Sequence, residues 1–262
     1  MIAEFFGRFL MVASKSKIFL RSVKKTGGAV NFLISKQIFW FMKNQIERNL
    51  FLIHRKISEA CKIYGRPEKR VNLIAVSKTV AAEKILEAIA AGCKVFGENY
   101  VKEAQEKWPE IKKNFPEIKL HFIGHLQSNK TDEAVDLFDS IQTLDSEKLA
   151  LALKKSAQKK SKNPEIFIQV NIGEEEQKGG ILPSELSDFV KFARDECALN
   201  VTGLMCIPPS SEAASPYFAL LAKMARENNL EKLSMGMSAD FEEAIALGAN
   251  YVRIGTAIFG AR

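Results

Sequence analysis

Residues 73–79 have the sequence LIAVSKT, a short apolar and β-branched run that ends in a lysine. Such a run predicts a buried strand. The chain then changes to a helical pattern over 81–91, where Ile85 and Ile89 recur on one face. Lys78 is therefore predicted at the carboxyl end of a strand, where the chain turns into a helix. This is the position at which α/β folds place ligands and chemistry.

A lysine at this position has two functional uses. It can hold an anion by charge, or it can lose its proton in a partly dry site and attack a carbonyl to form a Schiff base. The structural alternative is a lysine whose stem packs at the strand end while its ammonium reaches water. Residues 73–79 alone favour that alternative, so the choice depends on the rest of the chain.

The same alternation of strand and helix continues to the end of the chain. A first helix is predicted from Met42 to about Tyr64, because apolar residues recur at helical spacing until Gly65 and Pro67. Further strands are predicted at 94–97, 119–123, 140–143, 166–171, 201–207, 232–235 and 251–254. Helices are predicted at 81–91, 129–138, 146–160, 212–228 and 239–247. Two more are predicted, one that follows the strand at 94–97 and ends at about 113, and one that begins at Pro183. Eight strands alternating with helices over about 200 residues predict a single TIM (β/α)8 barrel. A doubly wound open sheet is the alternative, which the strand count disfavours.

The positive charge of the chain is concentrated in its first 41 residues. The net charge is +7, and residues 1–41 contribute +6 of it, with five Lys and two Arg against Glu4. The other 221 residues carry 31 basic and 30 acidic side chains, a net charge of +1. A nearly neutral domain argues against general nucleic-acid binding.

Three interpretations of this basic leader compete. It could be an organelle-targeting presequence, an amphipathic segment on a membrane surface, or the product of a start codon assigned too early. We favour the last, with Met42 as the true start, because every recognisable pattern follows it. We therefore expect a poorly ordered extension at 1–41 and a ligand-binding domain at 42–262.

The chain contains no apolar run long enough to span a membrane, so no membrane association is expected for the domain. The four cysteines are widely spaced and form no C-x-x-C pair, which suggests neither a metal site nor a disulfide framework. They are Cys61, Cys93, Cys197 and Cys206. A chain of this kind fits a reducing compartment, and we expect it in the cytoplasm.

Polar residues follow several of the predicted strands. Lys78 and Asn99 follow the first two, and His125 and Lys130 lie in the loop after the third. We expect a structural role for His125, with proton transfer as the alternative. Lys130 either contacts a ligand or partner or opens a helix.

The loops after strands seven and eight are the usual phosphate-binding place in a TIM barrel. Gly236 and Gly255 let backbone N–H groups approach an anion, and Ser238 or Thr256 can add a hydroxyl. From the residues alone, the prediction is a barrel that binds a phosphorylated ligand and has a lysine able to react with a carbonyl. A sugar phosphate, as in Schiff-base aldolases, and pyridoxal 5′-phosphate both satisfy it.

Six segments resemble the YggS/PROSC family, the pyridoxal phosphate homeostasis proteins. They are AVSKT (75–79), FGENYVKEA (96–104), HFIGHLQSNK (121–130), GLMCIPP (203–209), SMGMSADFEEAI (234–245) and VRIGTAIFG (252–260). Six motifs in order make the likeness specific, and it runs from about residue 45 to the end. It implies the barrel fold of the N-terminal domain of alanine racemase, with pyridoxal 5′-phosphate as the cofactor.

The resemblance also implies roles for individual residues. Lys78 would form a Schiff base with the cofactor, and Arg253 would face its pyridine nitrogen, with a structural ion pair as the alternative for Arg253. The remaining implied cofactor contacts are Asn99 beside the ring, and Ser238, Gly255 and Thr256 at the phosphate, with Ser234 as the alternative to Ser238. An arginine keeps the pyridine nitrogen unprotonated and makes a weak electron sink, suited to mild chemistry or carriage.

The first functional hypothesis is a non-enzymatic protein that buffers pyridoxal 5′-phosphate or delivers it to apo-enzymes. The alternative is an amino-acid racemase with weak activity. Racemases of this fold add a C-terminal β-domain and a second tyrosine base, whereas this sequence ends at Arg262 and offers only Tyr100 in a strand-end loop. A Schiff-base aldolase is a third hypothesis. Without the second domain and its dimer contacts, we expect a monomer.

Overall fold

A computed structural model describes residues 44–260, which form a closed barrel of eight parallel strands in sequential order. The strands are β1 (Asn72–Val76), β2 (Val95–Glu98), β3 (Lys119–Phe122), β4 (Ser140–Leu144), β5 (Glu165–Val170), β6 (Val201–Cys206), β7 (Lys232–Ser234) and β8 (Tyr251–Ile254). β1 pairs with β8 through Ile74 opposite Arg253, and this pairing closes the barrel. The predicted barrel is confirmed, and the open-sheet alternative is excluded.

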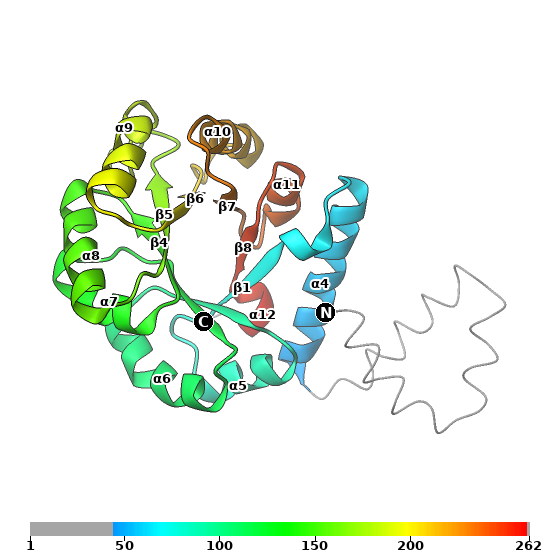
Figure 1. Ribbon diagram of the computed structural model, residues 1–262. Coiled ribbons are helices and arrows are strands. Elements are labelled where there is room, and N and C mark those ends of the chain that lie inside the picture. The colour runs from blue at the N-terminus through cyan, green and yellow to red at the C-terminus, as the bar shows by residue number, and fades with distance from the viewer. Residues whose placement is uncertain (1–43, 261–262) are drawn as a thin grey trace, which may run out of the picture.

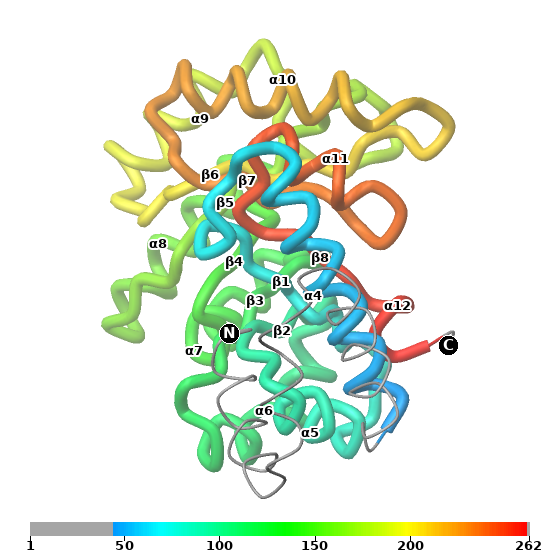
Figure 2. Tube along the Cα trace, turned by 90° about the vertical axis from the view of Figure 1, so that its right-hand side faces the viewer, coloured from blue at the N-terminus to red at the C-terminus, as the bar shows by residue number. Residues whose placement is uncertain are grey.

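Helices surround the barrel as a ring (Figures 1 and 2). They are α4 (Gln45–Ile63), α5 (Ala82–Ala90), α6 (Val101–Asn114), α7 (Thr131–Leu137), α8 (Glu147–Lys160), α9 (Leu186–Lys191), α10 (Ala214–Glu227), α11 (Phe241–Ala246) and α12 (Thr256–Phe259). The short 3-10 turns are η1 (Glu68–Arg70), η2 (Ser128–Lys130) and η3 (Pro183–Glu185), and η4 (Phe192–Glu196) is a π-helical turn. The expected leader at 1–41 and the expected start at Met42 lie outside the described residues.

Local sequence sets the ends of two helices. Ser146 caps α8, because its hydroxyl accepts a hydrogen bond from the Leu149 N–H at 3.4 Å. Gly248 follows α11 with φ = +113°, a conformation that glycine adopts without a steric penalty. The helix predicted from Pro183 differs in detail, since it is divided into η3, α9 and η4.

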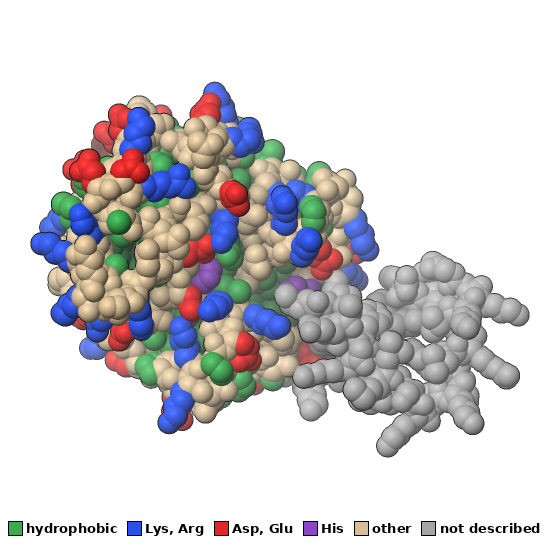
Figure 3. All heavy atoms as spheres, in the orientation of Figure 1, with side chains coloured by type: hydrophobic (Ala, Val, Ile, Leu, Met, Phe, Trp, Pro, Cys, Tyr) green, Lys and Arg blue, Asp and Glu red, His purple; other side chains and the backbone are tan. Residues whose placement is uncertain are grey.

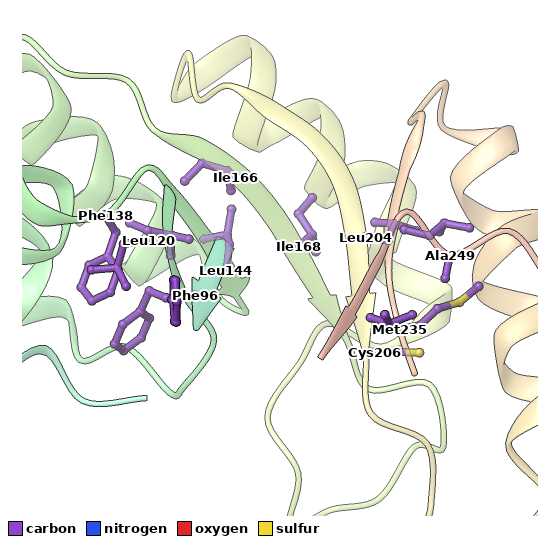
Figure 4. Close-up of a cluster of buried hydrophobic side chains, with 14 of the residues drawn as sticks. Phe96, Leu120, Phe138, Leu144, Ile166, Ile168, Leu204, Cys206, Met235 and Ala249 are labelled. Carbon is purple, nitrogen blue, oxygen red and sulfur yellow. The ribbon is translucent and has the colours of Figure 1, made fainter. Parts of the chain in front are cut away.

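The main hydrophobic core lies between the strands and the helices. Outward-facing side chains of adjacent strands, such as Ile166, Ile168 and Leu204, pack into one cluster with the helices (Figure 4). Four other buried apolar side chains lie outside this cluster, and we assign them to the barrel interior. They are Ile74, Val76, Phe167 and Met205. The alternation of a strand explains the two sets, because successive side chains point to opposite faces.

Helix α4 fills the gap between α5 and α11 and ties the start of the domain to its end (Figure 1). The Asn49 side chain donates to the Ile258 carbonyl at 2.8 Å. Arg66, which follows α4, donates to the carbonyls of Ile245 and Ala249. Over residues 44–260, no helix is long and apolar enough to cross a membrane.

Candidate functional site at the carboxyl ends of the strands

Parallel pairing brings the carboxyl ends of all eight strands to one end of the barrel. Lys78, Asn99 and Gly255 follow β1, β2 and β8, which are direct neighbours in the barrel. Figure 3 shows basic, acidic and histidine side chains close together near the middle of one face, inside the ring of helices. The barrel therefore groups three of the predicted site residues on adjacent strands.

Lys78 is a half-buried lysine without a partner among residues 44–260. The ladder between β1 and β2 extends one residue past the strand, because the Ser77 N–H donates to the Gly97 carbonyl at 2.9 Å. The Ser77 hydroxyl donates to Glu98, on the outer face of the sheet. Alternation then directs Lys78 toward the barrel interior, on the face of Ile74. A lysine attacks a carbonyl only as the neutral amine, and a carboxylate partner would favour the charged form instead.

Arg253 is a buried cation with neutral hydrogen-bond acceptors. One terminal nitrogen donates to Ser234 Oγ at 2.8 Å and the other to the Cys206 carbonyl at 2.9 Å. Burial lowers the pKa of the guanidinium, but an arginine keeps its charge in proteins. No carboxylate lies within ion-pair distance of Arg253 among the described residues, so the ion-pair alternative is not observed there.

A chain of hydrogen bonds continues from Arg253 through the barrel interior. The Ser234 hydroxyl donates to Gln142 Oε1 at 2.7 Å, and Gln142 Nε2 lies 2.9 Å from His121 Nδ1. Burial lowers the pKa of His121 to about 4, so its ring is neutral near pH 7 and can accept at Nδ1. Ser234 is fully buried and bonded on both sides, which makes it a weaker phosphate candidate than the exposed Ser238. His121 is thus a buried histidine whose Nδ1 is satisfied inside the barrel.

The loop after β2 contains a buried acceptor without a donor. Asn99 Oδ1 is buried and has no hydrogen-bond partner among residues 44–260. The backbone of Asn99 lies against Gly124, where an added Cβ would come within 2.2 Å of the Asn99 carbonyl oxygen. The neighbouring Tyr100 is exposed at the start of α6.

The loops after β7 and β8 present small and polar residues at the surface. Gly236 has φ = +91°, and its carbonyl accepts from the Arg253 N–H at 2.9 Å, which joins the two loops. Ser238 and Thr256 are exposed, and Gly255 is half-buried at the start of α12. Within residues 44–260, no hydrogen bond occupies the two hydroxyls or the N–H groups of these three residues. Their donors are therefore available to an anion.

Two other residues from the sequence analysis lie in the loop after β3. His125 is exposed and lies 3.3 Å from Asp145 Oδ2, in the loop after β4. Lys130 pairs with Glu133 at 3.1 Å, one turn further along the same helical segment. Lys130 directly precedes α7, which agrees with the alternative that it begins a helix.

A buried network behind the site was not predicted from the sequence. Glu98 is fully buried, and it binds Ser77, Trp108 and Lys107. No signal in the sequence identified this contact, because it depends on α6 packing over the ends of β1 and β2. The four cysteines are all buried free thiols.

Comparison with known proteins identifies relatives over most of the chain. Residues 50–262 match the family described as alanine racemase, N-terminal domain. The pyridoxal phosphate homeostasis protein of Pasteurella multocida is 42% identical over 228 residues, which cover 83% of this chain and 97% of that protein. The protein of the same name from Escherichia coli K12 is 39% identical over 230 residues, covering 84% of this chain and 97% of the relative.

Solved structures show the same fold. PipY of Synechococcus elongatus, solved with pyridoxal phosphate bound, has a TM-score of 0.67 and 35% identity, covering 78% of this chain and 100% of PipY. The crystal structure described as that of an unknown protein from Bifidobacterium adolescentis has a TM-score of 0.76 and 29% identity, covering 82% of this chain and 94% of that one. The chain therefore belongs to the YggS/PROSC family of pyridoxal phosphate homeostasis proteins, within the wider family of the alanine racemase N-terminal domain.

Proposed function

We propose that this chain binds pyridoxal 5′-phosphate through Lys78 and acts in its homeostasis, as a carrier that buffers or delivers the cofactor. One observation carries the proposal. A half-buried lysine without a partner among residues 44–260 is directed into a barrel that also contains a buried arginine without a carboxylate partner in that range. The names of the relatives and the cofactor in PipY support it.

The residues fit the chemistry of the cofactor. When bound, the cofactor supplies an aldehyde that condenses with amines and a ring that withdraws electrons. As a neutral amine, Lys78 would attach by forming a C=N bond to the aldehyde carbon, and its two protons would leave with the carbonyl oxygen as water. Arg253 would donate to the pyridine nitrogen and keep it unprotonated, because its guanidinium does not give up a proton.

The other proposed contacts supply hydrogen bonds. Ser238, Gly255 and Thr256 would hold the phosphate with hydroxyl and backbone donors that no residue in 44–260 uses. Asn99 would lie beside the ring, where its buried Oδ1 requires a donor. We propose that the domain which holds the cofactor comprises residues 42–262 and acts as a monomer in the cytoplasm.

The carrier role is best tested by retention and transfer of the cofactor. Wild-type protein, Lys78→Ala and the exposed-site control Lys84→Ala would be loaded, desalted and mixed with an apo-form of a pyridoxal phosphate enzyme. We expect wild type and the control to retain the cofactor and restore the recipient's activity, whereas Lys78→Ala loses it on desalting. Equal retention by Lys78→Ala would show that Lys78 is not the attachment point.

Weak racemase activity is the second candidate, because the Tyr100 hydroxyl is exposed beside Asn99 and has no partner within residues 44–260. Loss of α-deuterium from labelled alanine measures it. The carrier proposal predicts slow exchange that Tyr100→Phe does not change. Fast exchange that disappears in Tyr100→Phe would favour the racemase.

A further inference from the structure

The turn that carries Lys78 has a backbone conformation that its sequence does not favour. Thr79 has φ = +58°, and a β-branched residue in this left-handed region is an outlier. Glycine or asparagine would adopt the conformation more readily. A conformation of this kind persists only where the surrounding contacts over-determine it. Side chains that hold this turn should therefore be identifiable.

Two side chains of α6 hold the turn. Glu103 Oε1 accepts the Thr79 N–H at 2.5 Å and lies 2.7 Å from Lys107 Nζ. Lys107 Nζ also donates to the Ser77 carbonyl at 3.0 Å and makes a longer contact with the Val80 carbonyl at 3.4 Å. One ion pair thus contacts the strained residue and both ends of the turn.

The same lysine connects the turn to a buried carboxylate. Glu98 Oε1 lies 2.8 Å from Lys107 Nζ and accepts from the Ser77 hydroxyl at 2.8 Å and the Trp108 indole at 3.0 Å. The Glu98 side chain is fully buried, and its other oxygen has no partner among residues 44–260. A buried carboxylate is costly without its counter-charge, so Lys107 is required for this arrangement.

The network is placed to align two proposed cofactor contacts. Ser77 directly precedes Lys78, and Glu98 directly precedes Asn99. The hydrogen bond between Ser77 and Glu98 therefore joins the backbones from which Lys78 and Asn99 extend. Because alternate residues point to opposite faces, the network lies outside the barrel while Lys78 points inward.

We propose that Lys107, with Glu98 and Glu103, is a positioning group that fixes the Ser77–Val80 turn and so sets the direction of the Lys78 amine. Lys107 does not touch the cofactor. The inference rests on the proposed role of Lys78. It states that the network determines how fast Lys78 attaches the cofactor. An amine held in the reactive orientation reacts faster than one that must search for it.

Lys107→Met is the central test, because methionine keeps an unbranched side chain and removes the ammonium. The matched control is Lys113→Met. Lys113 is exposed on the same helix and has no ion pair within residues 44–260. Two probes separate attachment from binding. Pyridoxal 5′-phosphate can bond to Lys78, whereas pyridoxine 5′-phosphate lacks the aldehyde and can only bind. Hydrogen exchange of the peptide containing Thr79, in cofactor-free protein, reports the turn itself.

We expect Lys107→Met to slow the appearance of the imine absorbance about tenfold while the Kd for pyridoxine 5′-phosphate changes less than about twofold. Thr79 should exchange faster, and Lys107→Arg should restore the rate to within about threefold of wild type, because it keeps the charge. If Lys107→Met does not fold, Glu103→Ala removes the Thr79 acceptor from a partly exposed position, with the exposed Glu106→Ala as control.

Two results would overturn the inference. Imine formation at the control rate would show that the network does not orient Lys78. If Lys107→Met weakened the binding of both phosphates equally and raised hydrogen exchange over the whole chain, the role of Lys107 would be merely structural. If wild-type protein forms no imine on Lys78, the proposed function itself is wrong. If wild type forms the imine and the variants form it at the same rate, only the role of the network is wrong.

Discussion

Replacing Gln142 with leucine tests the hydrogen-bond chain that supports Arg253. Gln142 is fully buried, accepts from Ser234 at 2.7 Å and donates to His121 at 2.9 Å. Leucine would leave the Ser234 O–H without its acceptor and the histidine Nδ1 without its donor, while Ser234 Oγ would still accept from Arg253. Each orphaned group costs about 1–3 kcal/mol, and the apolar side chain returns about 1–2 kcal/mol. We therefore expect a loss of about 3 kcal/mol in the free energy of unfolding.

Urea unfolding followed by circular dichroism measures this loss, with Gln105→Leu as control, since Gln105 is exposed on α6. In thermal unfolding of the same variants, the midpoint temperature should fall by about 6–12 °C for a domain of this size. Gln142→Glu sharpens the test, because a carboxylate still accepts from Ser234 but can pair with His121 only when that ring is protonated. Its stability deficit should therefore shrink as the pH falls. If the free energy of unfolding of Gln142→Leu lay within about 1 kcal/mol of the control, the two hydrogen bonds of Gln142 would not stabilise the fold as expected.

Two further predictions concern His121 and Gly124. The pKa of His121 is about 4 in the folded protein against 6.5 for a free histidine, so the unfolded state binds more protons between these values. Stability should thus fall as the pH drops through this window, by on the order of 3 kcal/mol. His121→Gln should flatten that part of the pH profile in denaturant titrations, and an unchanged profile would contradict the assignment. Gly124→Ala would place a Cβ 2.2 Å from the Asn99 carbonyl oxygen, and we expect a loss of about 1–3 kcal/mol. The control Gly179→Ala, where the nearest atom is at 3.2 Å, should lose less, and equal losses in the two variants would argue against a tight Gly124–Asn99 contact.

The fold could be predicted because its signals are local. The run at 73–79 predicts the strand observed at Asn72–Val76, and the other seven predicted strands lie within one residue of those observed. The number of strands predicts closure. Periodicity also gave the positions of α4 and α8. The division of the segment after Pro183 into η3, α9 and η4 was not predicted, since no residue there marks the π-helical turn.

The site could be predicted only in part, because its supporting contacts join residues distant in sequence. The position of Lys78 at a strand end could be predicted, but its role was indicated only by the resemblance of six segments to a known family. The acceptors of Arg253 come from β6 and β7, and the partner of Glu98 comes from α6. Glu98 directly precedes a polar loop residue in the sequence, but its side chain lies on the outer face of the sheet and accepts from Trp108. Such choices follow from packing, which a single sequence does not reveal.

The most direct test of the central claim is to trap the cofactor on the protein. Wild type and Lys78→Ala would be incubated with pyridoxal 5′-phosphate, reduced with borohydride, digested and analysed by mass spectrometry. If Lys78 holds the cofactor, we expect a visible absorbance band that reduction removes, with the pyridoxyl group on Lys78 and absent from the variant. A label spread over exposed lysines, or equal labelling of Lys78→Ala, would contradict it.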